Sequence, residues 1–243
     1  MLGFLVTGVA ARAAELKVIA GAGFSPALRE LGPQFERMTG HKLMIQYAIG
    51  GALEKRLDSG DTFDLAIVPS GLLDGRAKLT RIADGTRNIV GRVSMAVATQ
   101  PGIPKPDISS VDAFKRAMLA ATSVTYLPES AVGTHVATVF ERLGITEQMK
   151  AKTEPQTSVE RLTQAVANGD AALGFAPSTI FASASGVEVV GPFPPELQSY
   201  IVYSIGVGVA AAQPEAARAF LRYVASAEAT AIMKAKGVEP ANP

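Results

Sequence analysis

Three turns rich in glycine and serine follow apolar, strand-like runs near the start of the chain, at residues 21–26, 49–52 and 69–71. In an open α/β sheet such turns lie at the carboxyl ends of the strands, where ligands bind. We expect these turns to lead into helices, whose first N–H groups have no partner within the helix and carry its positive dipole end. The pattern therefore predicts an anion site built mostly from backbone N–H groups.

A simpler interpretation applies to each of these positions. Gly23, Gly50 and Gly51 would then only supply positive φ angles in tight turns. Ser25, Ser158 and Ser178 each precede an expected helix, where serine is a favoured N-cap. The two roles are compatible, because an N-cap lies beside the N–H groups that an anion would use. We favour the site, since the turn recurs after three successive strands.

The composition argues against several kinds of chemistry. With no cysteine, the chain has no disulfide, thiolate metal site or cysteine nucleophile. His41 and His135 lie far apart without a cluster of carboxylates, so no metal is expected. The formal net charge of +1 gives no electrostatic footprint for nucleic acid or an anionic membrane. We therefore predict no catalytic residue, metal or cofactor.

An enzyme remains the rival class, because fold does not fix function. No G-x-S-x-G motif and no pattern pairing a nucleophile with a base is present. Asp64 and Glu129 could form a carboxylate pair, although Asp64 suits the entry of a strand. Arg161 could reach a carboxylate ligand, although a helical arginine is more often solvated.

The alternation of strand-like and helical periodicity predicts an α/β fold. Pro26 suits the first position of a first helix, with Ser25 as its N-cap, and we expect a kink or break at Gly32-Pro33. The expected strands lie at residues 16–20, 43–47, 64–68, 94–98, 123–126, 171–176, 187–190 and 201–209. The expected helices lie at residues 26–39, 52–58, 111–119, 133–143, 158–168, 214–225 and 227–236, with a short one after Ser178.

Two extended segments, near residues 93–98 and 201–207, are expected to cross between two lobes. A proline-rich stretch at residues 101–106 marks the change of direction after the first crossing. A cleft would then lie between the lobes, and such interfaces are a preferred location for small-ligand pockets.

The N-terminus suggests export. Residues 2–10 form an apolar run too short to span a bilayer, and Ala11-Arg12-Ala13 fits an A-x-A cleavage signature. The basic region that normally opens a signal peptide is missing. We favour a signal peptide truncated at its start over residues 1–14; an ordinary apolar strand or helix is the alternative.

The order of short motifs resembles the periplasmic molybdate-binding protein family, of the type II periplasmic substrate-binding fold. The motifs are Gln34-Phe35 with Gly40, Tyr47 to Gly51, Gly60 with Asp64-Leu65, Pro128-Glu129 with Gly133, Leu143-Gly144, residues 172–175, residues 186–190 and Phe193-Pro194. The resemblance extends over about residues 15–237. It implies one lobe from residues 15–92 and 208–243, and a second from residues 93–207 that includes the hinge crossings.

The resemblance implies a periplasmic, monomeric solute-binding protein that closes over a small anion and delivers it to an ABC transporter permease. A ligand-sensing module for signalling is the alternative. The expected ligand-binding residues are Ala22, Gly23, Phe24, Ser25, Ile49, Gly50, Gly51, Ser70, Val132, Gly133, Ser158, Val159, Pro177 and Ser178.

The chain departs from the family at the hydroxyl donors that hold the tetrahedral oxyanion. The two family serines fall at Gly23 and at residues 49–51, and the family tyrosine falls at Pro177. The backbone donors fall near Val132 and Val159. Because a buried dianion needs every oxygen hydrogen-bonded, we expect poor molybdate or tungstate binding unless the serines compensate. The roomier, more apolar site would suit a small organic acid.

Overall fold

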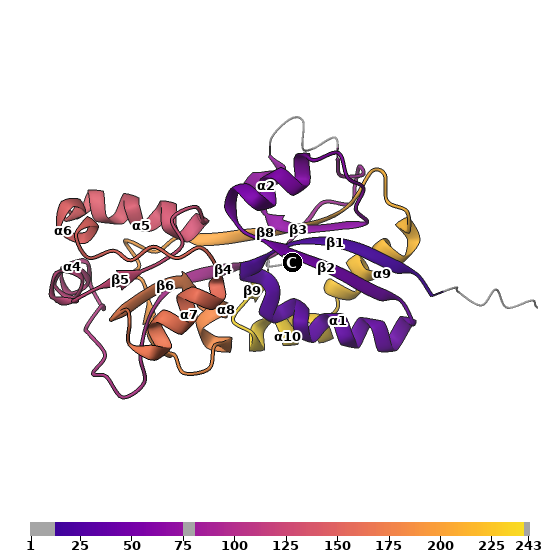
Figure 1. Cartoon of the computed structure of the whole chain (residues 1–243). Helices are drawn as coiled ribbons and strands as arrows, with labels where there is room; N and C mark the ends of the chain where they lie inside the picture. Colours follow the sequence, from indigo (N-terminus) through magenta and orange to yellow (C-terminus); the bar gives the residue numbers. More distant parts are fainter. Residues whose placement is uncertain (1–12, 75–80, 241–243) are drawn as a thin grey trace, which may run out of the picture.

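The computed structural model describes residues 13–74 and 81–240, which form an α/β fold around one sheet (Figure 1). Along its main path the strand order is β2-β1-β3-β8-β4-β6-β5, and β7 and β9 both pair with β4. The strands are β1 (Glu15–Gly21), β2 (Lys42–Ala48), β3 (Leu65–Pro69), β4 (Asn88–Thr99), β5 (Val124–Thr125), β6 (Leu173–Pro177), β7 (Glu188–Pro192), β8 (Tyr200–Val207) and β9 (Glu239–Pro240).

The helices divide between the two ends of the molecule, which Figure 1 shows as a first half on the right and a second half on the left. The first half contains η1 (Ala22–Phe24), α1 (Ser25–Thr39), α2 (Gly50–Asp58), η2 (Ser70–Leu73), α9 (Pro214–Val224) and α10 (Ala227–Ala235). The second half contains α4 (Val111–Ala120), α5 (Ala131–Arg142), α6 (Thr146–Lys150), α7 (Val159–Asn168) and α8 (Ser178–Ser183).

In the first half, the sheet is covered on both faces because its strands alternate. Val18 and Ala20 of β1 pack into the core formed with α1, whereas Ile19 between them packs toward α2 with Leu53 and Leu57. Strand β1 pairs in parallel with β2 and β3. Parallel strands of one sheet end at the same edge, so η1 and α2 both begin there.

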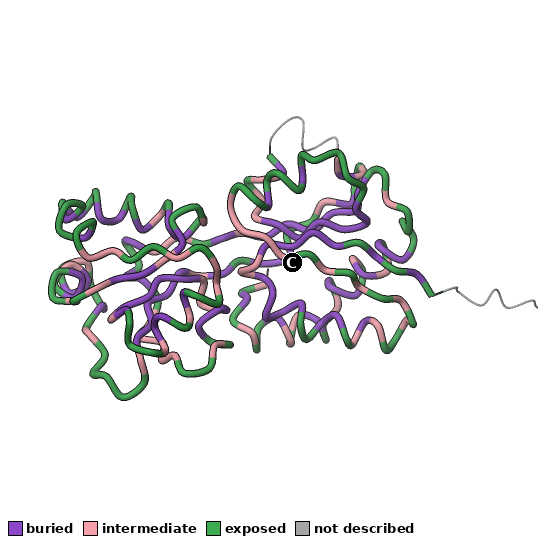
Figure 2. Tube along the Cα trace, in the orientation of Figure 1, coloured by how far each residue is buried: buried purple, intermediate pink, exposed green. Residues whose placement is uncertain are grey.

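The second half repeats this arrangement. Val97 of β4 and Phe175 of β6 belong to the core that contains α4 and α5, whereas Ala96 and Ala176 pack with Ile180 of α8 and with α7. Figure 2 shows the result as buried strands with helices exposed on their outer sides.

Strands β4 and β8 connect the two halves. Residues 88–94 of β4 pair with β8, and residues 95–98 of the same strand pair with β6. The two strands therefore lie side by side and antiparallel, although within the predicted crossings only Val93 and Ile201 pair with each other. The division into lobes at residues 92/93 and 207/208 stays a prediction.

Most predicted elements are confirmed, with α6, β9, η1 and η2 missed. Of the predicted kink or break at Gly32-Pro33, the break is wrong, because α1 continues through Pro33, and the kink stays a prediction. Pro33 and Arg29 are exposed, so water can bond the Arg29 carbonyl that loses its helical donor. Ser25 is also not an N-cap, since Phe24 occupies that position and Ser25 begins the helix.

Residues 1–12 of the expected signal peptide lie outside the described part of the chain. Within residues 13–74 and 81–240, no helix is both long enough and apolar enough to cross a membrane.

Candidate functional site

Two adjoining cavities lie between the halves. The smaller, here called the inner chamber, has a volume of about 70 Å³ and is lined by Gly23, Gly50, Val132, Pro177 and Tyr203 among others. The larger, here called the outer cleft, has a volume of about 600 Å³. The residues that line both are Ala22, Ala48, Ile49, Leu127, Ser130 and Val159. Together they offer one site with an apolar interior and a polar mouth.

Three helices begin at these cavities. Helix α2 of the first half begins at Gly50, and α5 and α7 of the second half begin after Ser130 and Ser158. Each of these serines caps its helix, accepting the N–H of Gly133 at 3.0 Å and of Arg161 at 3.3 Å respectively. The N–H groups of the first two residues after each cap have no partner within the helix and are suited to an anion.

The halves touch closely at Gly50. Its φ of +50° is in the left-handed region, and a Cβ there would collide with the backbone carbonyl oxygen of Glu129. A second contact lies at η1, where the Thr179 hydroxyl donates to the Gly23 carbonyl at 2.7 Å. The structure is therefore a closed arrangement that glycine at position 50 permits.

Tyr203 brings a hydroxyl group into the inner chamber. It belongs to β8, is 2% exposed, and packs against Phe24 with ring centroids 5.2 Å apart. A Cβ on Gly23 would collide with this hydroxyl and would also lie 3.2 Å from the ring of Pro177. Among the described residues the hydroxyl has no hydrogen-bond partner, and burial raises its pKa.

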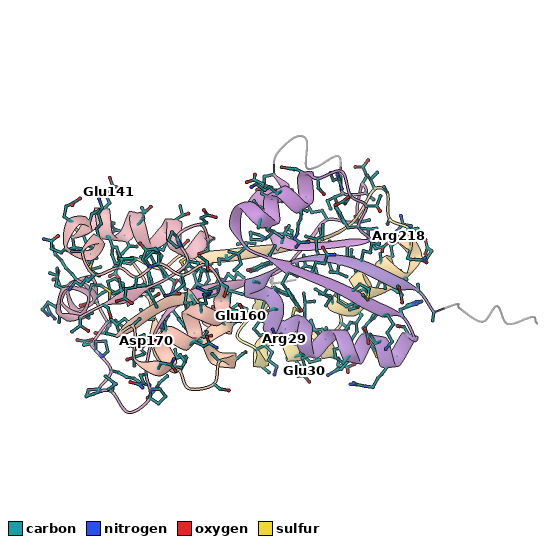
Figure 3. All side chains as sticks on the ribbon, viewed as in Figure 1. Arg29, Glu30, Glu141, Glu160, Asp170 and Arg218 are labelled. Atoms are coloured by element: carbon teal, nitrogen blue, oxygen red, sulfur yellow. The ribbon has the colours of Figure 1, made fainter. Side chains whose placement is uncertain are left out.

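The outer cleft is polar and carries charge. Arg29 and Ser25 of α1 line one side, and Gln156, Ser158 and Glu160 line the other. Figure 3 shows Arg29 and Glu160 where the two halves meet. The outer cleft also contains Tyr47, whose pKa is raised by burial and lowered less by the nearby Arg29 charge. It can therefore take the charged groups of a ligand whose body lies in the chamber.

Of the predicted site residues, nine line the two cavities: Ala22, Gly23, Ser25, Ile49, Gly50, Val132, Ser158, Val159 and Pro177. The structure also confirms Ser158 as an N-cap. Whether these residues bind a ligand stays a prediction.

The other five do not line the cavities: Phe24, Gly51, Ser70, Gly133 and Ser178. Phe24 lies behind Tyr203, and Gly51 is exposed beyond the turn. The Gly133 N–H bonds to the Ser130 cap.

The two remaining serines bond to other serines. Ser70 shares a hydrogen bond of 2.8 Å with Ser204 in a separate groove. Ser178 accepts from Ser94 at 3.1 Å and is not an N-cap, because Pro177 precedes α8 in that position. Neither hydroxyl compensates for the missing family donors in the cavities.

The sequence reasoning missed Tyr203, Arg29 and Ser130. Ser130 carried a usable signal, because it precedes a helix that starts two residues earlier than expected. Tyr203 carried none, since it lies within an apolar strand far along the chain. Asp64 proves structural, because its carboxylate accepts the N–H groups of Lys17 and Gln213, each at 2.8 Å.

Over the described ranges, no group of three or more histidine, cysteine or acidic residues is placed to hold a metal ion. Arg161, the other candidate ligand group, lines neither cavity. The polar groups at the site are therefore backbone N–H groups, hydroxyls, one amide side chain and the charged groups of the outer cleft.

The chain is similar to known proteins over nearly its whole length. Residues 16–239 match the family model described as bacterial extracellular solute-binding protein. A curated relative from Pseudomonas sp, named aconitate isomerase, is 32% identical over 93% of this chain and 87% of its own length. The molybdate-binding protein ModA of Azotobacter vinelandii is 28% identical over 97% of this chain and 94% of its own length.

The fold is shared with solved structures. The periplasmic molybdate-binding protein of Azotobacter vinelandii superposes with a TM-score of 0.75 at 21% identity, covering 93% of this chain and 100% of that one. The predicted type II periplasmic-binding-protein fold and the resemblance to molybdate-binding proteins are thus confirmed.

Proposed function

The chain belongs to the bacterial extracellular solute-binding proteins, and we propose that it binds a small organic acid and delivers it to an ABC transporter permease. In this proposal it works in the periplasm as a monomer. The two halves close over the ligand by a hinge motion about β4 and β8, and the ligand stabilises the closed state through its higher affinity for it.

One observation supports the ligand class: the small inner chamber is lined mostly by apolar groups, whereas polar groups gather in the outer cleft. A tetrahedral dianion needs donors around all its oxygens, because desolvation without hydrogen bonds is costly. An organic acid needs donors only at its carboxylates, so its carbon skeleton can lie against Ile49, Val132 and Val159. The N-termini of α2, α5 and α7 would receive a carboxylate.

The relative named aconitate isomerase favours the same ligand class, because aconitate is a small unsaturated tricarboxylate. We infer that a di- or tricarboxylate fits the combined site better than molybdate or sulfate. Arg29, at the mouth, would face a carboxylate that does not enter the chamber.

A thermal-shift screen tests this ligand class. The probes are trans-aconitate, citrate, tricarballylate and succinate on one side, and molybdate, tungstate, sulfate and phosphate on the other. A ligand that binds only the folded state raises the melting temperature with concentration. We expect a rise with at least one organic acid and none with the inorganic oxyanions. A rise with molybdate or tungstate alone would contradict the proposal.

An isomerase is the second candidate, favoured by the 32% identity to aconitate isomerase. Among its described lining residues, the inner chamber has Tyr203 as a proton donor but no carboxylate, imidazole or amine to act as a base. A base would have to come from Glu129 or Glu160 in the outer cleft. This arrangement favours binding over turnover.

An assay of cis-aconitate conversion to trans-aconitate, followed by ultraviolet absorbance or chromatography, separates the candidates. Binding of aconitate without conversion would support the transport protein. Conversion that is lost in Glu129→Gln but kept in Glu141→Gln, an exposed glutamate on α5 outside both cavities, would establish the enzyme instead.

A further inference from the structure

We propose that Tyr203 is the residue that selects the ligand inside the chamber, by donating its hydroxyl hydrogen to an oxygen of the bound organic acid. This inference rests on the proposed function and adds to it the residue that hydrogen-bonds the part of the ligand inside the chamber. The hydroxyl comes from the crossing strand β8 rather than from either of the loops that open α2 and α5.

The Tyr203 hydroxyl faces the chamber and has no hydrogen-bond partner among the described residues. Tyr203 is 2% exposed, and no described protein group accepts or donates a hydrogen bond to its hydroxyl. Every fully buried polar side-chain atom of the described residues has a hydrogen-bond partner, so this unbonded hydroxyl is not fully enclosed and faces the space of the chamber. A group that lines a cavity in this state is explained by a ligand that completes its bonding.

The neighbours Gly23 and Pro177 leave room for the Tyr203 hydroxyl and supply no hydroxyl of their own. Any Cβ at position 23 would collide with it, so Gly23 is needed for Tyr203 to lie there. Pro177, the next neighbour, has neither a hydroxyl nor an N–H. Gly23 and Pro177 are also the positions where the family resemblance implies a serine and a tyrosine hydroxyl. The Tyr203 hydroxyl from β8 therefore lies beside two positions that lack the family's donors.

The Tyr203 hydroxyl also stays protonated in the closed structure. Burial without a nearby positive charge keeps Tyr203 a neutral phenol, because burial raises its pKa. A neutral O–H donates one hydrogen bond, which suits a single carboxylate oxygen or an alcohol on a carbon skeleton. It cannot satisfy the several oxygens that a tetrahedral dianion would present to the same apolar space.

The position of Tyr203 in β8 also links its hydroxyl to closure of the two halves. Tyr203 pairs with Pro69 of β3 and with Gly91 of β4, so it lies in the strands that connect the halves. A ligand bonded to it and to the N-terminus of α5 would touch both the crossing strand and the second half.

Titration calorimetry of Tyr203→Phe tests the inference. The control is Tyr200→Phe, which removes a hydroxyl from the same strand but outside the chamber, where the Tyr200 ring lies 4.1 Å from the Arg92 guanidinium carbon. The probes are the organic acid that most raises the wild-type melting temperature, and molybdate. Losing a hydrogen bond to a charged group predicts roughly a tenfold to hundredfold weaker acid binding for Tyr203→Phe. Tyr200→Phe is expected to bind as the wild type does.

A stability cycle between positions 23 and 203 locates the hydroxyl without any ligand. Gly23→Ala should lower the melting temperature strongly when Tyr203 is present, because the new methyl group meets the hydroxyl. In the Tyr203→Phe background the same change should cost much less, since the hydroxyl is gone. Equal effects in both backgrounds would overturn the placement of the hydroxyl beside Gly23.

The binding outcomes separate the two proposals. If the wild type binds an organic acid and Tyr203→Phe binds it equally well, the inference is overturned while the proposed function stands. If the wild type binds only molybdate, the proposed function fails, and the selective role of Tyr203 fails with it. If Tyr203→Phe loses affinity for the acid and the molybdate affinity stays negligible, both are supported.

Discussion

The inner chamber and the outer cleft share helix N-termini but differ in what surrounds them. In the chamber the lining is mostly apolar, with the Tyr203 hydroxyl facing its space. In the outer cleft Arg29 and Glu160 are exposed beside serine and glutamine side chains. Electrostatic interactions are screened at an exposed site, whereas shape and hydrogen bonding act fully in a buried one. If the proposed function holds, we expect the chamber to select the ligand and the outer cleft to add affinity for its charge.

The largest effect should come from filling the chamber at Gly50. Gly50→Trp would place an indole against the Glu129 backbone at a left-handed φ, so we expect it to keep the halves apart and abolish binding. Calorimetry measures the binding, and circular dichroism checks that the protein remains folded. The matched control is Gly51→Trp, because Gly51 is exposed and a Cβ there meets no neighbouring heavy atom within 4 Å. Unchanged affinity of Gly50→Trp would remove this turn from the site.

The next effect tests the backbone donors at the helix N-terminus. Val159→Pro removes the first N–H of α7, and proline suits this position because the preceding Ser158 is extended at φ −146° and ψ 159°. We expect roughly tenfold weaker binding, or about 1.4 kcal/mol. Val111→Pro is the matched control, since it makes the same change after the Ser110 cap of α4, away from the site. Equal binding by both variants would exclude the α7 N-terminus as a donor.

The contrast between the two regions also predicts a pH effect. Burial raises the pKa of Tyr203 in the folded protein above the usual value of about 10. The resulting stability is fully present below the unfolded-state pKa and is lost as pH rises through the folded-state pKa. Above about pH 10 the unfolding free energy should fall by up to about 1.4 kcal/mol per pH unit from this group.

Urea unfolding between about pH 8 and pH 11 measures this loss. Tyr203→Phe should remove much of it. Tyr47→Phe, which removes a hydroxyl from the outer cleft, should remove less, because Arg29 offsets part of the pKa shift of Tyr47. A larger effect from Tyr47 would contradict the contrast between the chamber and the cleft.

The smallest effect is expected in the outer cleft. Arg29→Gln removes its exposed cation, and an exposed ion pair contributes about 0.2–1 kcal/mol, so binding should weaken by roughly twofold to fivefold. The loss should diminish at high salt because of screening. Arg37→Gln, exposed on the same helix but outside the cleft, should change nothing. A salt-independent loss beyond tenfold would place Arg29 in direct contact with a buried charge.

The sequence predicted the fold because its signals are local. Apolar periodicity marks each strand and helix, and the turn at Ile49 and Gly50 follows directly from the strand before it. The helix starts were less accurate: the η1 turn before α1 moved the cap from Ser25 to Phe24. Pro33 did not break α1, because packing of Leu28, Leu31 and Phe35 holds the helix together.

The site was predictable only in part, for the same reason. A turn can be recognised from its own glycine and serine residues. Tyr203, in contrast, reaches the chamber through sheet pairing between β8, β3 and β4. The spacing of residues along the chain does not encode that contact. Ser70 is a residue that was predicted for the site but does not line it. Its turn matched the pattern, yet in the fold its hydroxyl shares a hydrogen bond with Ser204.

The most direct test of the account is competition calorimetry on the wild-type protein, with a tricarboxylate titrated in the absence and presence of excess molybdate. The account predicts binding of the tricarboxylate with the negative heat-capacity change of apolar burial, and no displacement by molybdate. Tight molybdate binding that the tricarboxylate cannot displace would contradict it.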